Sequence, residues 1–252
     1  MTLLSKETFV CIDCETTGLD TQNDKVIEVA ISLFSWEGTV EQYDTLIDPG
    51  IPIPLSSIEI HHITDEMVAG KPKIEEILPT IFRIAGRYPI VGHQVQFDID
   101  ILAASAQRAG IPCNIKNNIV IDTLRLARKY GESPINSLQK LREHFNVEFE
   151  GPHRALSDVI VNIEVFKHLV KPYKTLKQIE DLLANPISMR TMPLGKHKGR
   201  LFKDIPLQYL RWAAKQDFDQ DLLFSLRSEL KKRQKGGGFQ QESSPFRDLH
   251  FE

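Results

Sequence analysis

Long hydrophobic runs are absent from this sequence. No apolar stretch reaches the roughly 18 residues that a membrane-spanning helix needs, and the first residues become charged too early for a secretory signal. Only three cysteines are present, which is too few for a disulfide framework. These absences exclude a membrane-spanning protein and a small disulfide-stabilised domain, and they favour a cytoplasmic protein.

Positive charge is scarce over most of the chain and is concentrated near its end. Residues 1–189 contain 18 Lys and Arg against 26 Asp and Glu, whereas residues 190–235 contain 12 against 5. An acidic body joined to a basic segment indicates an anionic partner that is reached through the basic segment. A solvated basic surface without a ligand is the alternative interpretation.

The hydrophobic pattern predicts one α/β domain over residues 1–185. Three apolar or alternating segments predict an antiparallel meander, and helices then alternate with two short strands. Gly110 is expected to end one helix, and Asn136 to cap another. The expected strands are 8–14, 26–34, 39–47, 89–93 and 118–123, and the expected helical segments are 54–86, 97–110, 123–131, 136–145 and 154–170.

A second, smaller unit is expected after the boundary near residue 185. Residues 190–233 form a basic, α-rich module, and residues 234–252 follow as a glycine-containing polar tail that we expect to be flexible. The module has aromatic residues enough for a core of its own: Phe202, Tyr209, Trp212, Phe218 and Phe224.

Asp13 and Glu15 stand one residue apart in an otherwise apolar strand. Alternate residues of a strand point to the same face, so the two carboxylates repel one another unless a proton or a cation lies between them. A Mg²⁺ or Mn²⁺ site is one interpretation, and a solvated acidic edge strand is the other. Cys11 and Cys14 fall on opposite faces of the strand and are expected to be core residues rather than zinc ligands.

Three further residues make the metal interpretation stronger. Asp98 begins a predicted helix after a short strand, and Asp158 lies near the start of the last helix of the domain. Acids from separate elements can form a two-cation site that serves the attacking and leaving oxygens of phosphodiester hydrolysis. His153 follows a Gly-Pro pair just before that helix, where a histidine could accept a proton from water.

Taken together, the motifs resemble the DEDD exonuclease superfamily in its histidine variant, which includes the proofreading epsilon subunit of bacterial DNA polymerase and exonuclease X. The resemblance covers about residues 8–170. It rests on three motifs in order: DCETTGL from Asp13, HQVQFD ending at Asp98, and HRALSD ending at Asp158.

The resemblance implies an RNase H-like mixed five-stranded sheet and 3′-to-5′ removal of nucleoside monophosphates. It also implies that the four acids hold two Mg²⁺ ions, with Mn²⁺ as a substitute, and that His153 is the general base. The residues that it places at the terminal nucleotide are Thr16, Thr17, Gly18, Leu19, His61 and Gln94. Gln94 is a departure, because the family usually has Asn there, and the extra methylene could shift a supporting hydrogen bond.

The module also has a resemblance of its own. MPLGKHKGR from Met192, followed by DIP and YLRW, is similar to the module that follows the nuclease domain in exonuclease X-like proteins. Its phosphate-contact candidates are Lys196, Lys198 and Arg200. Tyr209 and Trp212 are either base-stacking residues or core residues.

We therefore predict a 3′–5′ exonuclease that releases nucleoside 5′-monophosphates from DNA 3′ ends in repair or proofreading. The segment Gln241–Phe246 resembles the peptide by which proofreading subunits bind the sliding clamp, which is the candidate protein partner. Two alternatives remain open: a 3′–5′ exoribonuclease, or a non-catalytic nucleic-acid- or clamp-binding subunit. The loss of a metal-binding acid or of His153 would indicate the second, and none is lost.

Overall fold

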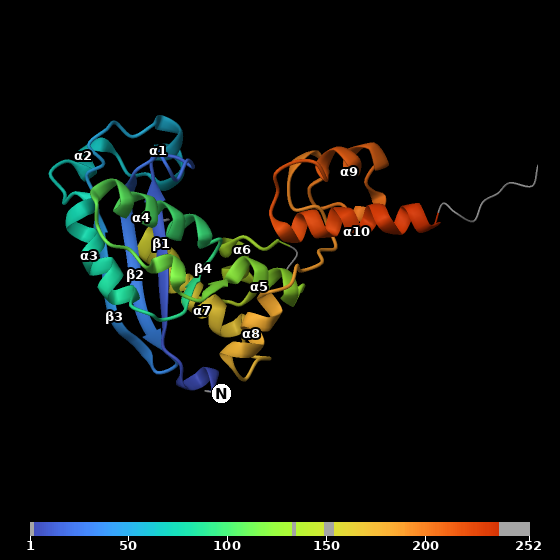
Figure 1. Cartoon of the computed structure of the whole chain (residues 1–252), viewed down its shortest axis with the longest axis horizontal. Helices are drawn as coiled ribbons and strands as arrows, with labels where there is room; N and C mark the ends of the chain where they lie inside the picture. The colour runs from blue at the N-terminus through green and yellow to red at the C-terminus, as the bar shows by residue number, and fades with distance from the viewer. Residues whose placement is uncertain (1–2, 133–134, 149–153, 237–252) are drawn as a thin grey trace, which may run out of the picture. The chain divides into compact units, whose positions relative to one another are not determined.

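The structure, a computed structural model, describes residues 3–132, 135–148 and 154–236. The chain divides into two compact units, Met1–Asn185 and Pro186–Glu252, and each is described by itself (Figure 1). Along the described residues, no helix is both long and apolar enough to cross a membrane.

The first unit is built on a mixed five-stranded sheet with the order β3-β2-β1-β4-β5. The first three strands form the predicted antiparallel meander, and β4 and β5 are added in parallel beside β1. The prediction of a mixed five-stranded sheet with flanking helices is therefore confirmed. The strands are β1 (Phe9–Thr16), β2 (Val26–Ser35), β3 (Gly38–Leu46), β4 (Ile90–Gly92) and β5 (Val120–Asp122).

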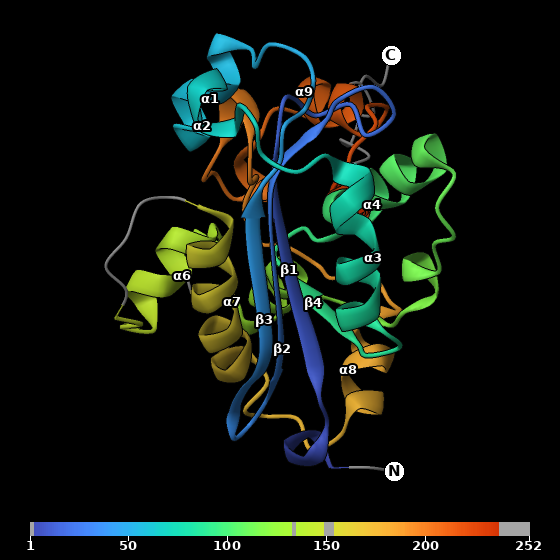
Figure 2. The same cartoon turned by 90° about the vertical axis from the view of Figure 1, so that its left-hand side faces the viewer.

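Helices cover both faces of the sheet (Figure 2). On one face, α3 and α4 pack over the apolar side chains Val10, Ile12 and Cys14 of β1. On the other face α7 crosses β1 and β2, and Cys11 points to it, with its Sγ 3.8 Å from the carbonyl oxygen of Val159. The two cysteines are buried on opposite sides of the sheet, as predicted.

The helices follow the predicted order, with one region divided more finely and one helix, α8 (Leu176–Leu183), that was not predicted. Residues 54–86, expected to be helical, form three helices, because His62 adopts a left-handed conformation and Gly70 turns the chain again. The helices of the first unit are α1 (Leu55–His61), α2 (Asp65–Val68), α3 (Ile74–Ala85), α4 (Gln96–Ala109), α5 (Thr123–Tyr130), α6 (Leu138–His144), α7 (Ala155–Leu169) and α8 (Leu176–Leu183).

The helix ends agree with one capping prediction and correct another. Gly110 ends α4 with a φ of 67°, a conformation that glycine adopts without steric cost. Asn136 was expected to cap the helix that follows it, and this is wrong: Ser137 is the cap, and its side chain accepts a hydrogen bond from the backbone N–H of Lys140.

A bulge in β2 frees one residue, Ile27, to pack against α1 and α2. The register passes from Glu15 opposite Glu28 to Thr16 opposite Val26, so Ile27 has no counterpart on β1. Ile27 is instead buried in a small apolar cluster with Ile53, Ile63 and Val68. Ile58 of α1 packs against this cluster, which holds α1 beside the end of β1.

The second unit has its own core, made of Met192, Phe202, Ile205, Leu210, Ala213, Leu222 and Leu226. Its helices are α9 (Leu207–Ala213) and α10 (Gln220–Gly236). Of the five aromatic residues of the predicted cluster, Phe202, Tyr209 and Phe218 pack in or against this core. The prediction is wrong for Phe224, which is exposed, and Trp212 is exposed too, so its core alternative does not hold.

Candidate active site

Asp13 and Glu15 lie on the α7 side of β1, because their neighbours Ile12 and Cys14 fill the core on the other side. β4 ends at Gly92, and its pairing with β1 reaches only Cys11. The last part of β1 therefore extends past its parallel neighbour.

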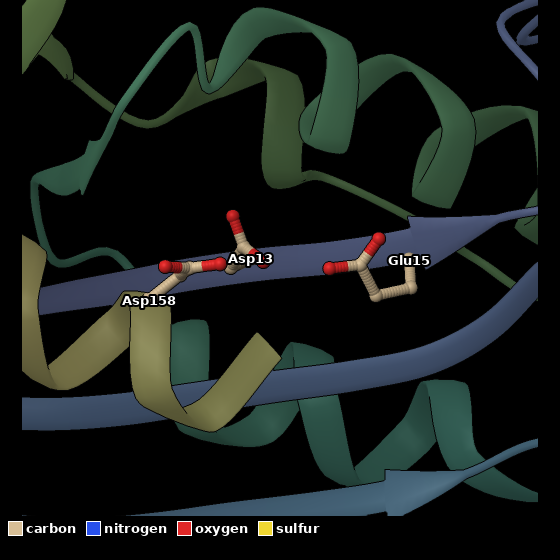
Figure 3. Close-up of side chains that lie close together, drawn as sticks. All are labelled: Asp13, Glu15 and Asp158. Carbon is tan, nitrogen blue, oxygen red and sulfur yellow. The ribbon is translucent and has the colours of Figure 1, made fainter. Parts of the chain in front are cut away.

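Asp158 completes a group of three acids. It lies in the first turn of α7, where its backbone N–H donates to the carbonyl oxygen of Arg154 at 3.1 Å. Carboxylate oxygens of Asp13, Glu15 and Asp158 all lie within 4.8 Å of one another. Figure 3 shows the three side chains converging between β1 and the start of α7. The chain thus brings together acids that are more than 140 positions apart.

The three acids repel one another strongly in this position. Burial raises the pKa of Asp13 well above its ordinary value, and the charges of Asp98 and Asp158 raise it further. Burial also raises the pKa of Glu15 to about 7, with Asp158 adding to the effect. Carboxylate oxygens at this spacing are the donor set that Mg²⁺ and Mn²⁺ prefer. A divalent cation would remove the repulsion, so the residues fit a metal site.

Asp98 lies beside this group rather than within the set of three. It is buried at the start of α4, and its Oδ1 accepts a hydrogen bond of 2.9 Å from the backbone N–H of Cys14. That N–H is free to donate because β4 ends before it could pair there. Burial raises the pKa of Asp98 to about 8, despite the hydrogen bond from Cys14, which lowers it.

Glu28 and Arg154 form an ion pair that sequence reasoning missed. Glu28 is 3% exposed and lies opposite Glu15 in the sheet. Its carboxylate accepts hydrogen bonds from Nε of Arg154, at 2.8 Å and 2.9 Å, from Nη2 of the same guanidinium, and from the backbone N–H of Ala155 at 3.1 Å. This pair fastens the start of α7, and therefore Asp158, to β2. A lone acid inside the apolar segment VIEVAISLF was the only signal for it.

The segment after β1 is held in a fixed loop. Thr17 is buried, its hydroxyl donates to Asp24 at 2.8 Å, and its carbonyl oxygen accepts from the hydroxyl of Ser57 on α1 at 2.7 Å. A Cβ on Gly18 would come within 2.5 Å of the Asp24 carboxylate, so a larger residue would displace that carboxylate from its hydrogen bonds with Thr17 and the Asp20 N–H. The hydroxyl of Thr16 donates to the carbonyl oxygen of Gly18 at 2.7 Å.

Leu19 and His61 differ sharply in exposure. Leu19 is 87% exposed in the loop that follows β1. His61 is 3% exposed, and its Nδ1 accepts a hydrogen bond from the backbone N–H of Ile63 at 3.0 Å. Burial lowers the pKa of His61 and favours the neutral ring. The proton is then on Nε2, which has no hydrogen-bond partner among the described residues.

Gln94 is held through its backbone. It has a φ of 60°, and its N–H donates to the Asp122 carboxylate at 3.1 Å. The same carboxylate caps α5 by accepting from the backbone N–H of Leu124 at 2.8 Å. The Gln94 side chain is exposed, so the extra methylene meets no steric obstacle.

Two groups of predicted residues are not tested by this geometry. The predicted general base His153 and the Gln241–Phe246 segment lie outside the described residues. Lys196, Lys198 and Arg200 are exposed residues of the second unit. Their predicted roles stay predictions.

Comparison with known proteins gives the first unit a family. A family model described as an exonuclease matches residues 10–166, and a model described as a putative quorum-sensing-regulated virulence factor matches residues 180–228. The chain is 34% identical over 184 residues to DNA polymerase III subunit epsilon of Aquifex aeolicus, covering 69% of this chain and 90% of that protein.

Two further similarities extend this result. A PolC-type DNA polymerase III of Clostridium perfringens is 33% identical over 176 residues, which are 69% of this chain but only 12% of that much longer protein. A solved structure of exonuclease X in complex with 5′ overhanging duplex DNA is 26% identical, with a TM-score of 0.54, covering 69% of this chain and 98% of the other.

The match over residues 10–166 is more than half of the chain, and it contains all three clustered acids. The chain belongs to the exonuclease family, and its first unit is a DEDD-type 3′–5′ exonuclease domain with the RNase H-like fold.

Proposed function

We propose that this protein releases nucleoside 5′-monophosphates from the 3′ ends of DNA by hydrolysis that depends on two Mg²⁺ ions. One observation carries the proposal: carboxylate oxygens of Asp13, Glu15 and Asp158 lie within 4.8 Å of one another at the open end of β1. The names of the relatives support DNA over RNA, since they include DNA polymerase subunits and a nuclease bound to duplex DNA.

Asp13, Glu15 and Asp158 would hold the cations, with Asp98 beside them as the fourth acid. When bound, divalent cations supply positive charge to the attacking and leaving oxygens of the phosphodiester and acidify water. The acids themselves repel a phosphate, so without cations the site opposes its substrate. The ion pair between Glu28 and Arg154 keeps Asp158 within reach of Asp13.

His153 would accept the proton of the attacking water. It directly precedes Arg154, which Glu28 binds, so the chain is anchored next to it. A histidine titrates near neutral pH, and this suits a general base. Its removal should leave metal binding intact and lower the rate of hydrolysis.

The terminal nucleotide would lie against the loop from Thr16 to Leu19. The exposed Leu19 side chain offers an apolar surface for a base, and the Nε2–H of His61 is a buried donor without a partner among the described residues. Gln94 would support the 3′ end from its exposed position. Because the loop is fixed by Asp24 and Ser57, little conformational entropy is lost when a nucleotide binds.

We place this activity in DNA repair or proofreading in the cytoplasm. The Gln241–Phe246 segment is the candidate contact for a sliding clamp. A pull-down of clamp by the parental chain, and by a chain in which Gln241 and Phe246 are both alanine, tests that contact. Equal recovery of clamp by the two chains would reject it.

The experiment for the proposal is digestion of end-labelled DNA and RNA of the same sequence, with Mg²⁺ and with EDTA. We expect 5′-labelled DNA to shorten one nucleotide at a time only with Mg²⁺, and the products to be nucleoside 5′-monophosphates. Faster digestion of RNA would establish the exoribonuclease alternative. Binding of DNA without digestion would establish the non-catalytic alternative.

A further inference from the structure

The second unit carries a hairpin whose tip lies against α9. The hairpin is held by the pairing of Thr191 with Leu201, by the Met192 N–H donating to the Arg200 carbonyl oxygen, and by the Gly199 N–H donating to the Met192 carbonyl oxygen. Its tip is a short 3₁₀ turn over Gly195–His197. The tip therefore has a defined conformation.

A series of aromatic rings leads from this tip to the surface. The ring of His197 lies 4.5 Å from that of Tyr209, which lies 5.2 Å from that of Trp212, measured between centroids. His197 is buried, whereas Trp212 is 52% exposed and is not part of the core of the unit. A tryptophan half exposed on a helix of a small unit leaves a flat apolar surface in water.

The hairpin tip lies against Tyr209, the residue whose ring neighbours the exposed ring of Trp212. Gly195 has a φ of 72°, and a Cβ there would lie 2.8 Å from the Tyr209 hydroxyl oxygen, so the tip approaches α9 closely. Lys196 and Lys198 flank His197 in the chain, and His197 contacts Tyr209, one helical turn before Trp212. We call Lys196, Lys198, Arg200, Tyr209 and Trp212 the hairpin face.

The cations of this face differ from other cations of the unit. Arg233 is bound by Glu229 and by the carbonyl oxygens of Phe202, Lys203 and Ile205, so its charge stabilises the fold. Lys196, Lys198 and Arg200 are exposed, and within the described ranges none of them makes an ion pair. The unit from residue 190 to 235 has 12 Lys and Arg against 5 acids. The surplus charge is thus available to an external anion.

We propose that the hairpin face binds single-stranded DNA, with Trp212 stacked on a base and Lys196, Lys198 and Arg200 at phosphates. Stacking suits this face because every base offers a flat surface, and an exposed ring, combined with cations on the adjoining hairpin that are unpaired among the described residues, matches a strand that alternates bases and phosphates. An acidic protein surface has no such regular alternation of flat rings and negative charges. The inference deepens the proposed function, since it rests on DNA being the substrate and adds a second contact with it.

The test is binding of a labelled 12-nucleotide oligo-dT to the full chain in EDTA, where hydrolysis cannot occur, followed by fluorescence anisotropy. Trp212→Ala should weaken binding roughly 5- to 100-fold, because stacking of one base accounts for such a factor. Trp212→Phe, which keeps a flat ring, should restore most of the affinity. Phe224→Ala, the matched exposed aromatic of the unit, should bind as the parental chain does.

The charge contacts have their own control. The double variant Lys196→Gln/Lys198→Gln should lower the slope of log affinity against log salt by about 1.4, since each contact with a single strand contributes about 0.7. Lys231→Gln/Lys232→Gln makes the same charge change on α10 and should leave the slope within about 0.3 of the parental value. Equal slopes for the two double variants would overturn the assignment of phosphate contacts.

Three results would overturn the proposal. One is parental affinity in Trp212→Ala, another is an equal loss in Phe224→Ala, and the third is displacement of the oligonucleotide by polyglutamate at equal charge, which would indicate an acidic protein partner. Hydrolysis with Mg²⁺ is measured separately on the parental chain. A chain that binds through Trp212 but hydrolyses nothing refutes the proposed function alone, and a chain that hydrolyses DNA but binds independently of Trp212 refutes this inference alone.

Discussion

The two units of this chain hold their surplus charge in opposite ways. In the first unit, Asp13, Glu15 and Asp158 are close together and partly buried, and burial and the neighbouring carboxylates together raise the pKa of Asp13. In the second, Lys196 and Lys198 are exposed on a hairpin. Repelling charges that are kept close together cost stability, whereas exposed charges cost little. The acids therefore indicate a selected site for a cation, and the lysines a surface for a large anion.

The largest expected effect is on hydrolysis. Asp13→Ala should lower the rate of mononucleotide release by about 10³-fold or more, because transition-state stabilisation of several kcal/mol is lost with the metal ligand. Glu37→Ala, which removes an exposed acid from a turn, should have the parental rate. Single-turnover digestion measures both. Parental activity in Asp13→Ala would remove the acids from the chemistry.

The next effect is on folding, through the ion pair between Glu28 and Arg154. Glu28→Ala should lower the free energy of unfolding by about 1–3 kcal/mol, because the half-buried Arg154 guanidinium loses its carboxylate partner and the backbone N–H of Ala155 loses its acceptor. Glu41→Ala is the matched control, since it breaks the exposed pair with Arg83 and should cost less than about 1 kcal/mol. Urea unfolding distinguishes the two, and equal costs would contradict the role given to Glu28.

The metal-free protein should have an unusual dependence on pH. The pKa of Glu15 is raised to about 7 and that of Asp98 to about 8, so the folded protein binds protons that the unfolded chain releases. These groups therefore destabilise the fold increasingly as the pH rises from about 4 to about 8.

Thermal unfolding in EDTA tests this dependence. The melting temperature should fall between pH 6 and pH 8.5, and Mg²⁺ should raise it most at pH 8.5. Asp13→Asn removes one of the repelling charges, so it should be more stable than the parental chain in EDTA at pH 8, by about 0.5–2 kcal/mol. A less stable Asp13→Asn protein at that pH would show that repulsion is not the dominant effect.

The smallest expected effect belongs to the second unit. Lys198→Ala should change the free energy of unfolding by no more than about 0.5 kcal/mol, because its side chain is exposed and makes no ion pair within the described residues. Chemical unfolding measures this change. A cost comparable with that of Glu28→Ala would mean that the hairpin lysines stabilise the fold, and the contrast between the units would disappear.

The local pattern of residues was enough to predict the strands, the meander and the D-x-E face, whereas the mixed five-stranded sheet was implied by the family resemblance. Alternation along β1 placed Asp13 and Glu15 on one face, and the apolar runs on either side defined the other strands. The meander followed from short polar links. These features depend on residues that are close in sequence, and for that reason the sequence predicts them well.

Features that depend on distant residues were not predictable in this way. The hydrogen bond between Asp98 and the Cys14 N–H exists because β4 ends early, and the pairing of Glu28 with Arg154 joins positions 126 apart. The exposure of Trp212 is a similar case. Tyr209 and Trp212 lie one turn apart on α9, yet only the hairpin decides which ring is covered.

A calorimetric titration with Mn²⁺ tests the central claim, that the three acids form a cation site, most directly. The parental chain should bind Mn²⁺ more tightly as the pH rises from 6 to 8, because the cation competes with protons for Asp13 and Glu15. Asp13→Asn should bind at least about 10-fold more weakly at pH 8. Equal affinity of the two proteins for Mn²⁺, or an affinity that does not change with pH, would contradict the account.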